Sequence, residues 1–155
     1  MTFTLLNASL WAVMAALNPC NASMSPVGLD GQTVDVIGTL IFSQHSSHLI
    51  ETSAIDKTEG CMVYVEFGDH ELLFAPGGTR EYIRDPNLRK FVVSYRSYLK
   101  ANPARPKAFR VTGRLRVKND FKMVRAGHWN GYGYHGLFRT AIVVQSVADL
   151  EPSRR

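Results

Sequence analysis

The chain has 155 residues, a formal net charge of +5 and a pI near 9.4. This is the length of one domain that can bury a hydrophobic core, which excludes a mini-protein that needs metal or disulfides to fold. A content of 45% hydrophobic and 20% charged residues is ordinary for a globular domain, and the positive charge permits an anionic partner without requiring one.

The first 29 residues contain no Asp, Glu, Lys or Arg. Residues 5–17 form an apolar run that fits the core of a signal peptide and is too short to span a membrane. Residues 20–22 or 13–15 supply a small-x-small cleavage pattern, although no basic residue precedes the run. We expect a signal peptide over 1–22, a linker over 23–29 and a mature protein that begins near Ser23 and is periplasmic or secreted. The alternative is an N-terminal helix packed on a cytoplasmic domain.

The state of the two cysteines depends on that cleavage. A cut after Ala22 would leave Cys61 alone, as a small buried apolar residue. If Cys20 were retained in an oxidising compartment, a Cys20–Cys61 bridge would become possible. Residues 17–19 do not resemble a lipoprotein box, so we expect no lipid anchor.

Residues 34–40 and 109–115 share one pattern, with apolar residues at alternate positions and glycine (Gly38, Gly113) at the fifth. Alternation predicts strands, and a glycine inside a strand predicts a bend, a bulge or a close backbone approach. Two bent strands far apart in sequence favour a small closed barrel. Further strands are expected over 49–54 and 61–67, the latter with Met62, Tyr64 and Glu66 on one face and the odd-numbered residues on the other.

A helix is predicted over 86–102. Asp85 suits the N-cap and Pro86 the first helical position. A single apolar stripe follows at helical spacing, formed by Leu88, Phe91, Val92, Tyr95 and Leu99. After it we expect a strand over 109–118, a long loop over 119–136, a last strand over 137–147 and a tail over 151–155.

This order of elements resembles the OB-fold, a five-stranded Greek-key barrel with a helix between strands three and four. The residues that carry the resemblance are Val34, Val36, Gly38 and Leu40, then Phe109, Val111, Gly113 and Leu115, with the helix between them. It covers residues 30–150 and, with the apolar start, is similar to small exported bacterial OB-fold proteins. A small α+β sandwich with the same elements is the competing fold.

Charge is unevenly distributed along the chain. Residues 30–79 contain eight acids and one base (net −7), whereas residues 80–155 contain 17 bases and five acids (net +12). The barrel would be polarised if these halves occupied different faces. The alternative is that strands from both halves pair and interleave their charges.

The resemblance implies a ligand site on the face of strands two and three and in the loops joining strands one–two and four–five. These places hold His45, His48, Tyr64, Lys122, Arg125, His128, Trp129, Tyr132 and Tyr134. The aromatic rings there could stack on nucleobases or sugar rings, while the basic side chains Lys122 and Arg125 meet an anionic group such as phosphate. The histidines could instead bind metal, but no familiar motif is completed, so we predict no metal and no cofactor. The third alternative is a loop that simply covers an open barrel end.

Catalytic motifs are not found: the sequence has no phosphate-binding glycine loop, no Gly-x-Ser-x-Gly and no paired-cysteine zinc spacing. We therefore expect a non-catalytic binding or interaction module of the bacterial cell envelope, with an anionic or ring-containing ligand or an envelope protein as its partner. The alternative function is single-stranded nucleic-acid binding through residues 89–125, if the protein is not exported. It would use the basic strand residues Arg110, Arg114, Arg116 and Lys118.

Overall fold

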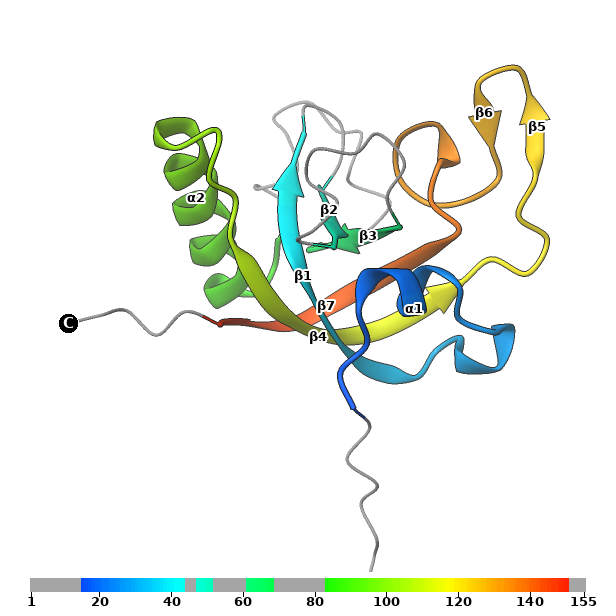
Figure 1. The fold of residues 1–155 in the computed structure, drawn as a ribbon, viewed down its shortest axis with the longest axis horizontal. Helices are drawn as coiled ribbons and strands as arrows, with labels where there is room; N and C mark the ends of the chain where they lie inside the picture. The colour runs from blue at the N-terminus through cyan, green and yellow to red at the C-terminus, as the bar shows by residue number, and fades with distance from the viewer. Residues whose placement is uncertain (1–14, 44–46, 52–60, 69–82, 151–155) are drawn as a thin grey trace, which may run out of the picture.

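A computed structural model describes residues 15–43, 47–51, 61–68 and 83–150, apart from the side chain of Tyr134. Five strands close into a barrel in the order β1-β2-β3-β7-β4 (Figure 1). Their bounds are β1 (Thr33–Phe42), β2 (Ser47–Ile50), β3 (Met62–Glu66), β4 (Ala108–Val117) and β7 (Thr140–Asp149). Neighbours are antiparallel except β3 and β7, which are parallel. With helix α2 (Pro86–Ala101) between β3 and β4, the predicted OB-like, mainly β fold class is confirmed.

The barrel core follows the predicted alternation. In β4 the buried positions include Phe109, Val111, Leu115 and Val117, while Arg110 and Arg114 are exposed. β1 pairs with β4 along most of its length, so the two glycine-containing strands are neighbours, as expected. Gly113 lies at the register shift between β4 and β7, where an added Cβ would sit 2.9 Å from the carbonyl carbon of Val143. Close backbone approach is therefore the reason for glycine at this position.

Helix α2 begins and packs as its sequence predicts. The Oδ1 of Asp85 accepts hydrogen bonds from the backbone N–H groups of Asn87 (2.7 Å) and Leu88 (3.1 Å), and Pro86 is the first helical residue. Leu88, Val92 and Tyr95 are buried, and Phe91 and Leu99 pack against the same core. The Tyr95 hydroxyl donates to the Leu40 carbonyl at 2.8 Å, which fixes α2 to β1.

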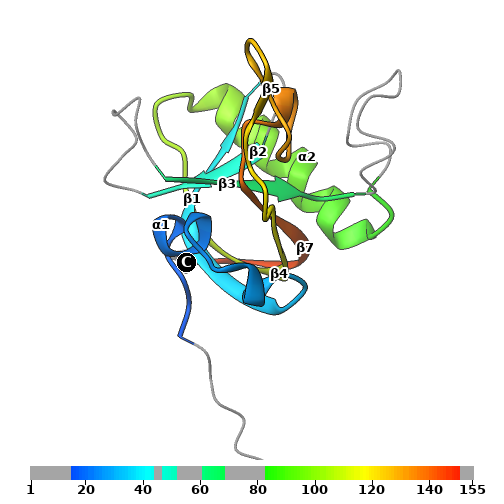
Figure 2. The same cartoon turned by 90° about the vertical axis from the view of Figure 1, so that its right-hand side faces the viewer.

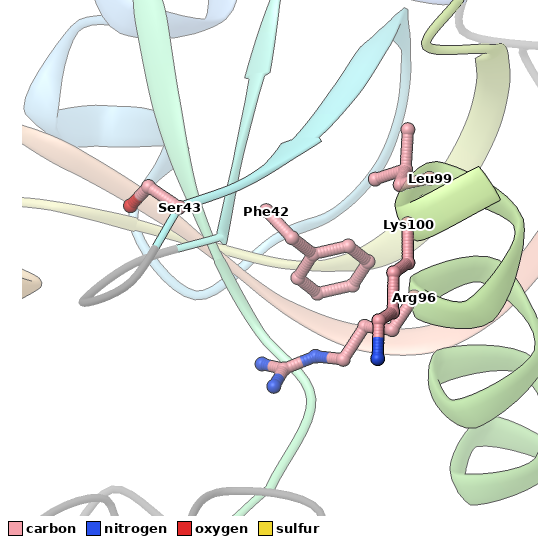
Figure 3. A pocket seen from close by; sticks show the side chains of 5 residues that line it. All are labelled: Phe42, Ser43, Arg96, Leu99 and Lys100. Atoms are coloured by element: carbon pink, nitrogen blue, oxygen red, sulfur yellow. The ribbon is translucent and has the colours of Figure 1, made fainter. Parts of the chain in front are cut away.

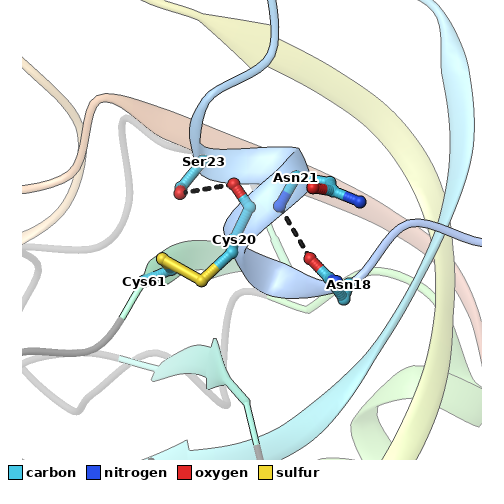
Figure 4. The surroundings of a disulfide bond; sticks show 5 residues. All are labelled: Asn18, Cys20, Asn21, Ser23 and Cys61. Carbon is cyan, nitrogen blue, oxygen red and sulfur yellow. Dashed lines mark hydrogen bonds between the residues drawn. A yellow bond between two sulfur atoms is a disulfide. The ribbon is translucent and has the colours of Figure 1, made fainter.

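The N-terminal segment differs from the expected linker, because it packs on the barrel. Leu17 forms a parallel bridge to Val36, and the short helix α1 (Pro19–Ser23) follows, with Ala22 fully buried. Cys20 and Cys61 form a disulfide that ties α1 to the residue before β3 (Figure 4). A 3-10 turn, η1 (Val27–Leu29), then leads into β1. The packed unit therefore starts well before residue 30.

Several element boundaries also differ from the sequence prediction. β2 ends at Ile50 rather than at 54, and the last strand starts at Thr140 rather than at 137. The expected loop over 119–136 contains a hairpin of β5 (Met123–Arg125) and β6 (His128–Trp129), followed by the 3-10 turn η5 (Tyr134–Gly136). Among the described helices, none is long and apolar enough to cross a membrane.

The two charged halves of the sequence interleave in the barrel. Asp35 on β1 pairs with Arg110 on β4 at 3.1 Å, and Glu66 on β3 pairs with Arg116 on β4 at 3.2 Å. Acidic and basic stretches that are separate in sequence thus lie on neighbouring parts of one surface. The alternative of interleaved charge describes these strands better than a polarised barrel.

Candidate interaction surface at the barrel mouth

The segment between β6 and β7 folds back over the outer face of β3 and β7. Tyr132 and Phe138 exchange two backbone hydrogen bonds, of 2.7 and 3.1 Å, which close this segment into a narrow loop. Phe138 packs on Tyr64 of β3 and Ala141 of β7, with Tyr132 beside them, in a hydrophobic cluster separate from the barrel core. The chain therefore covers its own strand-three face at this place.

Tyr64 consequently does not form part of an accessible contact surface, contrary to its predicted role. Its side chain is 5% exposed, and burial, followed by the nearby Glu66 carboxylate, raises its pKa to about 12. His48, its neighbour in the β2–β3 register, is half-buried with its ring 5.7 Å from that of Phe138. Burial lowers the pKa of His48, so the neutral imidazole is favoured here.

Arg116 holds the loop to the barrel. Its guanidinium lies 3.2 Å from the Glu66 carboxylate, which is 2% exposed, and 4.8 Å from the centre of the Tyr132 ring. A cation between a buried carboxylate and an aromatic face stabilises both. Arg116 thus acts in the structure itself, through its ion pair with Glu66 and its contact with the Tyr132 ring.

The β5–β6 hairpin is built on contacts of its own. The rings of Phe121 and Trp129 stack at 4.9 Å. The side chain of Asn130 accepts a hydrogen bond from the Lys122 backbone N–H and donates one to the Asp120 carbonyl, each of 2.8 Å. Gly127, with φ of +72°, makes the turn that joins the strands. Trp129 is therefore half-buried, with its ring stacked on Phe121 within its own hairpin.

The exposed side chains lie in residues 122–125, the strand side of the hairpin just ahead of the turn at Gly127, and we call this segment the hairpin tip. Met123 pairs with Trp129 and Arg125 with His128, so Val124 is the extra residue of a β-bulge. Met123 and Val124 are 53% and 59% exposed, and the flanking Lys122 and Arg125 are exposed too. In both views the hairpin projects away from the barrel (Figures 1 and 2).

The histidines do not gather into a metal site within the described residues. His128 and His135 stack with ring centres 4.2 Å apart, and Nδ1 of His135 lies 3.0 Å from the Gly127 carbonyl oxygen. Partial desolvation, then Arg125 and His135, lower the pKa of His128. No group of three or more His, Cys, Asp or Glu side chains is placed to hold an ion in the part of the chain that the structure describes.

The predicted site residues therefore divide into three groups. Lys122, Arg125, His128 and Trp129 lie in or directly beside the hairpin, whereas Tyr132 belongs to the covering loop. Tyr64 and His48 lie against the covering loop instead. His45 falls outside the described residues, and nothing is described of the Tyr134 side chain.

The basic stripe of β4 is largely engaged within the barrel. Arg110 pairs with Asp35, which also accepts a 2.6 Å hydrogen bond from Thr112, and Arg116 pairs with Glu66. Arg114 is exposed, and Lys118 is half-buried at the strand's end. This arrangement gives the β4 face less positive charge than its sequence predicts.

Away from the hairpin, a hollow lies between the end of β1 and the end of α2 (Figure 3). It encloses about 320 Å³ and is lined by Phe42, Ser43, Arg96, Leu99 and Lys100. The Arg96 guanidinium lies 4.9 Å from the centre of the Phe42 ring, so it covers the aromatic wall of the hollow.

Sequence reasoning missed the apolar tip. Met123 and Val124 were read as part of a loop whose aromatic and basic residues would make the contacts. The sequence did contain a signal for a hairpin, because Gly127 lies in a short turn between residues 123–125 and residues 128–129.

No protein-family model matches the chain, and no curated protein is significantly similar to it.

Proposed function

We propose that this protein is a non-catalytic interaction module of the cell envelope, and that its contact surface is the β5–β6 hairpin with the adjoining loop at the barrel mouth. The observation that carries the proposal is the exposure of Lys122, Met123, Val124 and Arg125 together on a projecting hairpin. Adjacent exposed apolar side chains that are rimmed by polar or charged residues are a feature of interaction sites.

Export to an oxidising compartment is part of this proposal. The Cys20–Cys61 disulfide supports it, since such bonds persist outside the reducing cytoplasm. Cleavage after Ala22 would remove Cys20, so a cut after Ala15, at the other small-x-small pattern, agrees better with the bonded cysteine. The mature chain would then keep Leu17 and α1.

Binding to total envelope fractions tests this function without assuming a partner. One variant carries four changes to Gln, at Lys122, Met123, Val124 and Arg125. The control variant carries Lys90→Gln, Val93→Gln and Lys100→Gln on the exposed side of α2. We expect the hairpin variant to lose retention on the envelope fraction and the α2 variant to keep it. Equal retention of both variants would refute the assigned surface.

Nucleic-acid binding is the rival outcome, and salt separates it. A single-stranded oligonucleotide bound through β4 would be released steeply as salt rises. Replacing Arg114 and Lys118 with Gln would then weaken that binding, whereas the hairpin changes to Met123 and Val124 would not.

A further inference from the structure

We infer that the partner of the β5–β6 hairpin is an anionic phospholipid surface, into whose interface Met123 and Val124 insert. This inference rests on the proposed function and names the partner of the same surface. It is drawn from the chemistry, support and size of the hairpin tip.

The chemistry of the tip matches the boundary between lipid headgroups and acyl chains. The two apolar side chains are adjacent in sequence, and Lys122 and Arg125 stand on either side of them. Apolar groups that enter the acyl boundary below bases that meet lipid phosphates are the combination that holds a segment at such an interface. Asp120 is the one acid within five residues of this pair, against Lys118, Lys122 and Arg125.

The bulge at Val124 explains why both apolar side chains are available. In an unbroken strand, successive side chains point to opposite faces, so the two would lie on opposite sides of the hairpin. The extra residue re-aims the strand locally, and both Met123 and Val124 are more than half exposed.

The hairpin is also firmly supported, so its tip does not have to be ordered on binding. Several contacts stabilise it: the stacking of Phe121 on Trp129, the two side-chain hydrogen bonds of Asn130, and the contact of His135 with the Gly127 carbonyl. A surface that is ordered beforehand loses less conformational entropy when it binds. Trp129 pairs with Met123 across the hairpin, so its indole lies close enough to the tip to report on contact with a lipid surface.

The size of the tip favours a membrane over a protein. A stable protein interface covers about 800 Å² on each partner, supplied by roughly 20–30 residues. The exposed tip offers four side chains on a narrow projection, which suits shallow insertion into a lipid surface better than a broad contact. Two apolar side chains hold a protein weakly, so the attachment is reversible and depends on anionic lipid.

Vesicle binding with Trp129 as the reporter tests the inference. The protein has two tryptophans, and Trp11→Phe in the disulfide-bonded full chain leaves Trp129 as the sole indole, which is excited selectively above the tyrosine absorption band. Vesicles of phosphatidylcholine, with and without half phosphatidylglycerol, carry brominated acyl chains that quench inserted indole. We expect quenching with anionic vesicles, loss of it at high salt, and little with neutral vesicles. Because the signal comes from Trp129, attachment through residues 5–17 does not mimic this result.

Matched variants locate the contact. Val124→Gln should weaken partitioning about tenfold, and Lys122→Gln with Arg125→Gln about fivefold for each charge. Val93→Gln, at a 42% exposed valine on α2, and Lys90→Gln with Lys100→Gln should leave it unchanged. Unquenched Trp129, or equal losses in the α2 controls, would overturn the inference. If the hairpin is needed for retention on envelope fractions but the protein does not bind vesicles, the partner is a protein or glycan and the proposed function stands. If the protein shows neither hairpin-dependent retention nor vesicle binding, the proposed function and the lipid inference are both rejected.

Discussion

Cys20 and Cys61 join two segments that are 41 residues apart, and their bond fixes α1 against the start of β3 (Figure 4). The backbone supports the same arrangement. The Leu17 N–H donates to the Asp35 carbonyl at 2.8 Å, and the Ile37 N–H donates to the Leu17 carbonyl at 2.9 Å. The N-terminal segment is thus attached to the barrel both covalently and by hydrogen bonds.

Removal of this disulfide should destabilise the fold. Closing a loop of this length contributes about 4 kcal/mol in the chain-entropy model, within a usual range of roughly 2–5 kcal/mol. We expect Cys20→Ala with Cys61→Ala to lower the free energy of unfolding by that amount in urea titrations, and a reductant to have a matching effect on the native protein alone. Equal stability of the two proteins would show that the bond contributes little.

If the protein is exported as we propose, the position of the disulfide also predicts where its N-terminus is processed. Protein recovered from the envelope of its host should begin ahead of Cys20, with a mass that fits cleavage after Ala15. Intact-mass measurement before and after reduction checks both points, because the bonded pair gains two hydrogens. A mature chain that starts at Ser23 would contradict this prediction and would agree with the N-terminus expected from the sequence alone. A full-length chain from the cytoplasm would contradict export.

His48 should make stability depend on pH. Burial lowers its pKa below the usual value of 6.5, so the unfolded chain binds more protons just below that value. The folded state is therefore stabilised above about pH 6.5 and loses this contribution as the pH falls towards the folded-state pKa. Urea midpoints measured from pH 7.5 to 5 should fall in the wild type and fall less in His48→Gln. If the urea midpoints of the two proteins fall equally with pH, His48 is not the cause of the pH dependence.

Gly113→Ala tests the close packing of β4 on β7. The new Cβ would press on the backbone of Val143, which cannot move without breaking the sheet. We expect a loss of about 1–3 kcal/mol or more, the usual range for overpacking. Gly28→Ala is the matched control, since nothing lies within 4 Å of a Cβ at that position. Calorimetric Tm values for the two variants give the comparison, and similar values would argue against the packing described here.

The barrel could be predicted from the sequence because its signals are local and repeated. Alternating residues in 34–40 and 109–115 gave the paired strands, and Asp85 with Pro86 gave the start of α2. A glycine inside a strand also predicted a bulge or a close backbone approach, and both are found at Gly113, where a Cβ would meet the backbone of Val143. These features follow from short-range geometry, which a sequence displays directly.

The site could be predicted less well because its contacts depend on how one loop folds back. Tyr64 alternates with inward residues and so was placed on an open face, but Phe138, 74 residues later, covers it. Arg116 looked available for an anion until the fold brought Glu66 beside it. The pairing of Cys20 with Cys61 required α1 to pack beside the start of β3, which composition does not indicate. Each of these outcomes is set by tertiary contacts between distant residues.

Photo-cross-linking in the native host tests the central claim most directly, because it asks which surface touches the envelope. The same photoreactive amino acid is placed at Val124 on the hairpin or at Val93 on α2, two valines that are both exposed in the structure. The account predicts that position 124 forms cross-linked products with envelope components and that position 93 does not. Cross-links from position 93 with none from position 124 would contradict it.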